Sequence, residues 1–272
     1  YGTLELAKIE NMRTQHDDLA AGKKVQSTDD LENEEAPQAA PDEPAGGGTA
    51  APEKKFGFLA VCAGDGLAAL FRDLGADRVV SGGQPMNPST QSILEGVNAI
   101  PAETVFVLPN NGNIIMAAQQ CAALTEKNVV VIPSKTVPQG ITALMNVDFE
   151  ADDAQSITDA MNESLSVVAT AQITYAARNS DFDGFEIKEG DYLALMEGKL
   201  FGTDGSIDML LTNLAEEAVK REATFISLYF GEDVTEEDAR KAGRLFEEAC
   251  PDAEVSVLYG GQPVYYYIIS LE

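Results

Sequence analysis

The chain has 272 residues, 44% of them hydrophobic, and carries a formal net charge of -27 with a sequence pI near 4.2. This length suits one large domain or two ordinary ones, and the apolar content can fill a core. The negative field argues against nucleic-acid partners and anionic membranes, because proteins bind both through lysine and arginine. The simplest explanation of the charge is a solvated acidic surface, and the alternative is a face that attracts a basic partner.

The first 55 residues divide into two segments. Residues 1–24 begin with a strand-like pattern over Tyr1–Ile9, which indicates that the chain starts inside a domain of a longer protein. Residues 25–55 hold eight acidic residues among proline, alanine and glycine. Such a segment cannot bury enough apolar surface to order itself, so we expect a flexible, self-repelling linker.

Residues 56–148 predict a parallel α/β lobe. Four apolar runs are each followed by a polar loop and a helix-like pattern, which is typical of a parallel sheet with helices on both faces. The expected strands are 57–62, 78–81, 104–108 and 128–133, and the expected helices are 67–74, 89–99, 114–124 and 141–146.

Residues 149–272 predict a mixed α+β lobe. Helices are expected at 152–164, 207–221 and 235–250, and strands at 167–176, 185–187, 191–196, 199–201, 225–230, 254–259 and 264–270. A tight Glu197-Gly198 turn indicates an antiparallel hairpin. The fold class is therefore α/β, with a parallel-sheet lobe followed by a mixed α+β lobe.

Three polar loops follow strands of the first lobe, at residues 82–90, 108–113 and 134–136. The carboxyl ends of parallel strands meet at one sheet edge, where ligands of such folds bind. Helix N-terminal amides beside hydroxyl and amide side chains favour a carboxylate or phosphate. The candidate ligand-binding residues are Gly82, Gly83, Gln84, Asn87, Ser89, Thr90, Asn110, Asn111, Asn113, Ser134 and Lys135. The alternative is that these residues cap helices and hold turns.

We expect no catalytic or metal site in this chain. The single histidine, His16, lies before the predicted lobes, which excludes a Ser–His–Asp triad or a Cys–His pair within them. The Ala63-Gly64-Asp65-Gly66 turn lacks the third glycine of a dinucleotide loop and the lysine of a P-loop, so no cofactor is expected either.

The cysteines indicate the compartment. Cys62, Cys121 and Cys250 are widely separated and odd in number, which suits reduced thiols in the cytoplasm better than a disulfide framework. No stretch approaches the 18 apolar residues that indicate a membrane span.

Three motifs carry a resemblance to a known family. GGQPMNPST (82–90), LPNNGNIIMAA (108–118) and VIPSKTVPQGITALM (131–145) resemble the C-terminal region of the ATP-binding subunit of bacterial fatty acid kinase. That family has a dihydroxyacetone-kinase-like (DAK2) ATP domain at its N-terminus. The resemblance covers residues 56–272, and residues 1–16 resemble the end of the family's middle domain, so residues 1–24 are expected to be its tail. Pro85 and Gly112 depart from the family, which usually has threonine and often lysine there.

The resemblance implies a function for the complete protein. It would transfer the γ-phosphate of ATP to a fatty acid carried by a DegV-like binding protein, for phospholipid synthesis. ATP and Mg²⁺ would occupy the N-terminal domain, outside this chain. The C-terminal region would have a DegV-like fold and would dock the lipid-carrying partner. No catalytic residue carries over, because the ATP-site motifs have no matching positions here, and dimerisation through the parent protein stays open.

Two hypotheses therefore stand. In the first, the chain is a non-catalytic module that docks the fatty-acid-binding protein. In the second, the polar loops at 82–90 and 108–113 form a sensor site for a small anion. A free-standing hydrolase or transferase is disfavoured by the lack of histidine in the lobes.

Overall fold

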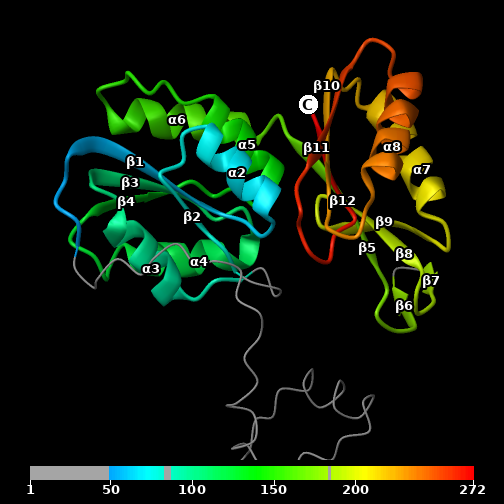
Figure 1. The fold of residues 1–272 in the computed structure, drawn as a ribbon, viewed down its shortest axis with the longest axis horizontal. Coiled ribbons are helices and arrows are strands. Elements are labelled where there is room, and N and C mark those ends of the chain that lie inside the picture. The colour runs from blue at the N-terminus through cyan, green and yellow to red at the C-terminus, as the bar shows by residue number, and fades with distance from the viewer. Residues whose placement is uncertain (1–48, 83–86, 183–184) are drawn as a thin grey trace, which may run out of the picture. The chain divides into compact units, whose positions relative to one another are not determined.

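The structure is a computed structural model that describes residues 49–82, 87–182 and 185–272 (Figure 1). The described residues all belong to one compact unit, Gly46–Glu272. The predicted strand at 1–9, the tail 1–24 and most of the linker 25–55 lie outside the described residues. None of the described helices is long and apolar enough to cross a membrane.

The first sheet is parallel throughout. Its strand order is β2-β1-β3-β4, with β1 at the centre paired to β2 on one side and β3 on the other. The strands are β1 (Lys54–Val61), β2 (Arg78–Val80), β3 (Ala102–Leu108) and β4 (Asn128–Val131). β1 and β3 are buried along most of their length, as expected for strands covered on both faces.

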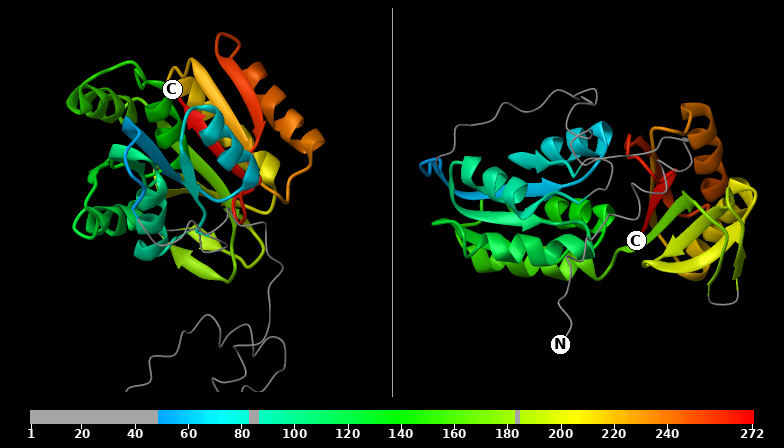
Figure 2. Two further views of the ribbon diagram at one scale, coloured as in Figure 1. Left: turned by 60° about the vertical axis from the view of Figure 1, so that its left-hand side comes forward. Right: turned by 90° about the horizontal axis from the view of Figure 1, so that it is seen from below.

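Helices cover both faces of this sheet (Figures 1 and 2). Two separate clusters of buried side chains fill the two layers, one with Leu67, Phe71 and Met161 and the other with Ile93 and Val97. On the first face lie α2 (Asp65–Asp73), α5 (Val137–Met145) and α6 (Ala154–Leu165), and on the second lie α3 (Thr90–Ala99) and α4 (Gly112–Cys121). We call this sheet with its five helices the first lobe, residues 49–165.

Two elements of the first lobe differ from expectation. α5 begins at Val137 rather than residue 141, because Thr136 caps the backbone amide of Gln139 and Pro138 occupies the first turn. α6 packs against α5 and places Ile157 and Met161 in the core of the first lobe. The division between the two sheets therefore falls after Leu165, whereas the sequence pattern placed the start of the second lobe at residue 149.

The second lobe, residues 166–272, contains a mixed sheet with the order β11-β10-β12-β5-β8-β9. β10 and β11 are parallel, and the other neighbours are antiparallel. The strands are β5 (Ala169–Tyr175), β8 (Tyr192–Met196), β9 (Lys199–Asp204), β10 (Phe225–Phe230), β11 (Glu254–Tyr259) and β12 (Tyr267–Leu271), beside a small ribbon of β6 (Ser180–Phe182) and β7 (Phe185–Ile187). The predicted fold class, a parallel α/β lobe followed by a mixed α+β lobe, is confirmed.

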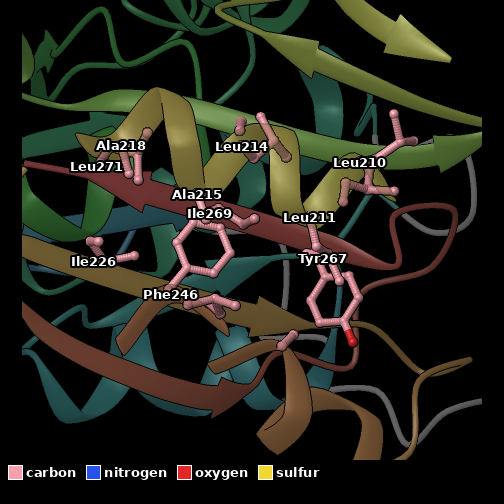
Figure 3. Close-up of a cluster of buried hydrophobic side chains, with 14 of the residues drawn as sticks. Leu210, Leu211, Leu214, Ala215, Ala218, Ile226, Phe246, Tyr267, Ile269 and Leu271 are labelled. Carbon is pink, nitrogen blue, oxygen red and sulfur yellow. The ribbon is translucent and has the colours of Figure 1, made fainter. Parts of the chain in front are cut away.

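Two helices cover one face of the second sheet, α7 (Ile207–Lys220) and α8 (Glu236–Ala249) (Figure 2). Leu210, Leu211 and Leu214 of α7 and Phe246 of α8 pack on sheet residues such as Ile269 (Figure 3). Each fully buried leucine or phenylalanine contributes about 1.5–3 kcal/mol relative to leaving it exposed, so this layer is a major source of stability for the lobe.

The opposite face of the second sheet packs on the first lobe. Tyr229 of β10 and Ile268 of β12 belong to the same buried cluster as Phe58, Leu67 and Phe71. Burial raises the pKa of Tyr229 to about 12. The two lobes therefore share this one cluster of buried aromatic and aliphatic side chains.

Backbone also meets backbone at this junction. The amide of Leu67, in the first turn of α2, donates to the carbonyl oxygen of Gly260 at 3.0 Å. A Cβ on Gly64 would lie 2.3 Å from that oxygen, and one on Gly66 would lie 2.1 Å from the oxygen of Tyr259. The glycines of the Ala63–Gly66 turn therefore let the first lobe contact the residues after β11.

Side-chain hydrogen bonds join the lobes elsewhere. The hydroxyls of Thr136 and Thr170 lie 2.8 Å apart, and the Thr142 hydroxyl donates to Oε1 of Glu272 at 3.0 Å. Because Thr142 and Thr170 are buried, these bonds satisfy hydroxyl groups that would otherwise lack a hydrogen-bond partner in the interface.

Gly64→Ala tests the backbone contact. Gly64 has a φ of 110°, so alanine adds backbone strain to the clash with Gly260. We expect the free energy of unfolding to fall by about 2 kcal/mol or more in a urea titration. Gly112→Ala is the matched control, because its Cβ would meet nothing within 4 Å at the start of α4. Similar losses for both variants would contradict the contact.

Candidate functional site

The carboxyl edge of the first sheet is organised around Asn110, which follows β3 and is buried. Its side-chain amide donates to the carbonyl oxygen of Val61 at 2.9 Å, and its Oδ1 accepts from the Ser134 hydroxyl at 2.8 Å. The Asn110 backbone amide donates to the same hydroxyl at 3.1 Å. One side chain thus connects the ends of β1 and β3 to the loop after β4.

This position is the switch point of the sheet. The chain passes from β1 to β2 on one side and later returns to β3 on the other, so the loops after β1 and β3 diverge. In open α/β sheets such a crevice receives the ligand. Here Asn110 spans it with a φ of 55°, and Gly140 packs so closely that a Cβ would lie 1.9 Å from the Asn110 Oδ1. Asn110 and Ser134 therefore hold the edge together with their own polar atoms.

Several other candidates cap helices. Ser89 accepts from the amide of Ser92 at the start of α3, and Asn111 accepts from the amide of Asn113 at the start of α4. The Asn111 amide also donates to Oδ1 of Asn87 at 3.2 Å, which joins the loops before α3 and α4. These bonds satisfy helix N-terminal groups that need a partner.

The remaining candidates are spread along the same edge. Gly82 and Thr90 are half-buried. The side chains of Asn87, Ser89, Asn113 and Lys135 are exposed. Gly83 and Gln84 lie outside the described residues. The candidates that the structure describes lie in the loops and helix starts at this edge, and a ligand there stays a prediction.

Cysteine chemistry and metal binding have little support in the described residues. Burial raises the pKa of Cys62 to about 12, so its thiol is protonated at neutral pH and is a poor nucleophile. Burial also raises the pKa of Cys121 and of Cys250. Within the described ranges, no cluster of three or more histidine, cysteine or acidic residues could hold a metal ion.

Sequence reasoning missed a second unusual region, the turn from Tyr259 to Val264 after β11. Tyr259 is 48% exposed, and Val264 has a φ of 72°, a conformation that disfavours β-branched residues. A signal was present in the sequence, because Gly260-Gly261-Gln262-Pro263 repeats the Gly-Gly-Gln-Pro of residues 82–85.

Asn110→Ala tests the role of Asn110 in joining the strand ends. It leaves the carbonyl of Val61 and the hydroxyl of Ser134 without this partner, and alanine also tolerates the positive φ less well than asparagine. We expect a loss of about 2–4 kcal/mol in unfolding free energy by urea titration. Asn113→Ala, at an exposed position in the first turn of α4, should change it by less than about 0.5 kcal/mol. Equal stability of the two variants would refute this role.

Comparison with known proteins identifies relatives of this architecture. Residues 57–272 match the FakA-like C-terminal family model of fatty acid kinase subunits. Protein YloV of Bacillus subtilis is 36% identical over 274 aligned residues, and an uncharacterized protein of Staphylococcus epidermidis is 34% identical over 272. Both alignments cover 100% of this chain and 46% of the relative. The chain therefore spans about half the length of these curated relatives.

Solved structures resemble the fold. A DegV family protein from Corynebacterium glutamicum has a TM-score of 0.57 at 14% identity, covering 80% of this chain and 96% of that protein. The Streptococcus pneumoniae fatty acid kinase B3 protein loaded with linoleic acid has a TM-score of 0.54 at 11% identity, covering 80% and 99%.

The sequence resemblance is thereby confirmed, and so is the DegV-like fold. The match over residues 57–272 includes both lobes and every described element from α2 onward. The chain belongs to the FakA-like C-terminal family of fatty acid kinase subunits.

Proposed function

We propose that this chain is the non-catalytic C-terminal module of the ATP-binding component of a fatty acid kinase, and that it docks a DegV-like fatty-acid-binding protein. The family match over residues 57–272 carries this proposal. The site geometry supports it, because the polar residues that could have formed a reactive centre, such as Asn110 and Ser134, bond to one another and to the backbone. The complete protein would act in the cytoplasm and supply acyl phosphate for phospholipid synthesis.

The contacts of the turn before α2 support placing ATP and Mg²⁺ outside this chain. The glycine-rich turn before α2 is the position where a nucleotide phosphate would bind in a related loop. Gly260 already accepts from the amide of Leu67 there, and the backbone after β11 fills the space beside Gly64. Nucleotide binding and phosphoryl transfer would therefore take place in another domain of the parent protein, and this module would position the partner that carries the fatty acid.

The negative charge of this chain supports a partner with a basic surface. Residues 56–272 carry a formal charge of -21. Glu232 and Asp233, between β10 and α8, are among the exposed acidic residues. A field of this sign speeds encounter with a positive surface and weakens as salt screens it.

A small-anion sensor is the second candidate function. Exposed Asn87, Asn113 and Lys135 lie at the carboxyl edge, near the N-termini of α3 and α4. A carboxylate or phosphate could accept hydrogen bonds from such groups. This function predicts a shift in melting temperature on adding the anion, in the absence of any protein partner.

Calorimetric titration tests the docking function. The chain is titrated with a DegV-like fatty-acid-binding protein, loaded with linoleic acid and empty, at about 0.05 and about 0.5 M salt, between which the Debye length changes about threefold. We expect binding whose affinity falls about tenfold at the higher salt. Absence of binding to either form would refute docking by this chain and would favour the sensor function.

A further inference from the structure

The turn after β11 combines features that stability alone does not explain. Val264 holds a strained φ of 72° and is 42% exposed, so its side chain gains little from burial. The Thr174 hydroxyl donates to the Val264 carbonyl at 2.9 Å, which ties this residue to the end of β5. Gln262 is 1% exposed, and its side-chain amide donates to the carbonyl of Tyr229 at 2.8 Å, which leaves its Oε1 without a partner in the described structure. Strain and unsatisfied polar groups that persist in a native protein often mark a functional segment.

Aromatic and aliphatic side chains lie in this turn, just after it and at the ends of β5 and β11. Tyr259 is 48% exposed and contacts Phe230 edge-on at a centroid distance of 5.4 Å. Beyond Val264, the ring of Tyr266 contacts Tyr175 edge-on at 6.5 Å, and Tyr175 is 47% exposed. We call Tyr175, Tyr259, Val264 and Tyr266 the aromatic surface. Tyrosines supply large contact area with few rotatable bonds, which suits an interface.

Acidic residues surround this surface. Asp65 and Glu232 are close enough to Tyr259, and Asp233 to Tyr266, to raise the pKa of each phenol beyond the effect of burial. All three acids are exposed. A hollow of about 340 Å³ adjoins Tyr259 and is lined also by Phe230, Val257 and the ion pair of Glu236 with Arg240. An apolar centre with a charged rim and an adjacent hollow is the arrangement typical of a specific protein interface.

The sequence Gly-Gly-Gln-Pro follows corresponding strands in the two lobes. β1-α2-β2 and β10-α8-β11 are both parallel β–α–β units, and Gly-Gly-Gln-Pro follows the second strand of each, at 82–85 and 260–263. The second copy begins beside the backbone contact between the lobes, because Gly260 accepts from Leu67. A partner seated on the aromatic surface would therefore touch both lobes, through Asp65 of the first and Tyr259 of the second.

We propose that the aromatic surface is the docking site for the DegV-like partner, which presents an apolar patch ringed by lysine and arginine. This inference rests on the proposed docking function and adds its location. The occupant follows from charge complementarity, since Asp65, Glu232 and Asp233 would each face a basic group at the rim. Tyr259 is the central anchor, and Val264 is exposed in the strained turn that follows Tyr259 in the chain.

Affinity measurements on variants of the full chain test the location. Tyr259→Ser should weaken binding of the DegV-like protein by about tenfold or more, as loss of a central aromatic anchor does. Glu232→Lys should weaken it and reduce its salt dependence. Two matched controls should bind with an affinity within about twofold of that of the unchanged chain. Phe225→Ser changes a side chain that is 56% exposed at the opposite end of the parallel β10–β11 pair, and Glu247→Lys changes an exposed residue of α8.

A third variant separates docking from stability. Val264→Gly relieves the positive φ, so we expect it to be at least as stable as the unchanged chain in urea while binding more weakly. If the unchanged chain binds the DegV-like protein and the Tyr259→Ser, Glu232→Lys and Val264→Gly variants bind it with the same affinity, the proposed location is wrong and the docking function stands. Equal losses in the controls also overturn the location. If the unchanged chain does not bind, the docking function fails and this inference fails with it.

Discussion

The hydrogen bond from Leu67 to Gly260 is the constraint on which the arrangement of the two lobes depends. It satisfies an amide in the first turn of α2, which has no partner within its own helix, with a carbonyl from the other lobe. It forms only because Gly64 and Gly66 carry no side chain where the backbone of Tyr259–Gln262 passes. Tyr229 and Ile268 then fill the shared core below it. The same contact occupies the helix end that an α/β fold could offer to a phosphate.

Closure of that helix end and of the sheet edge supports the proposed docking role over a catalytic one. At the switch point, Asn110 bonds to Val61 and Ser134 and spans the crevice between the diverging loops. Cys62 is a buried, protonated thiol, and the loop caps at Ser89 and Asn111 are engaged with helix ends. The features left over are surface ones: acidic side chains, exposed tyrosines and a strained turn. These are the features through which one protein recognises another.

Much of the fold could be predicted from the sequence because strand and helix periodicities are local. The runs that became β1, β3 and β10 are apolar and bounded by polar turns. Ser89 and Thr235 cap α3 and α8, close to the predicted helix starts at 89 and 235. Long-range packing was harder to predict. α5 began earlier than its pattern indicated because Val137 to Gly140 are buried against neighbouring segments, and α6 joined the first lobe because Ile157 and Met161 face its core. The strand predicted from residue 264 begins at Tyr267, after the turn at Val264.

The location of the candidate site was easier to predict from the sequence than the role of its residues. Because the carboxyl ends of parallel strands meet at one edge of a sheet, the loops containing Asn110, Asn111 and Ser134 were correctly predicted to lie together. Whether a buried asparagine binds a ligand or a neighbouring strand depends on atoms distant in sequence, such as the carbonyl of Val61, 49 residues away. The lobe contact was missed for the same reason, since Gly64 and Gly260 are far apart along the chain and only their shared lack of a side chain links them.

Amide hydrogen exchange at Leu67 tests the central claim most directly. An amide at the third position of a helix exchanges rapidly when it has no partner, because opening requires no tertiary change. If Gly260 accepts from it, the Leu67 amide should be protected to about the same degree as the core strands β1 and β10, and should lose that protection together with the lobe junction in Gly64→Ala. Exchange of Leu67 at the rate of an exposed helix end would contradict the closed junction and reopen the end of α2 as a ligand site.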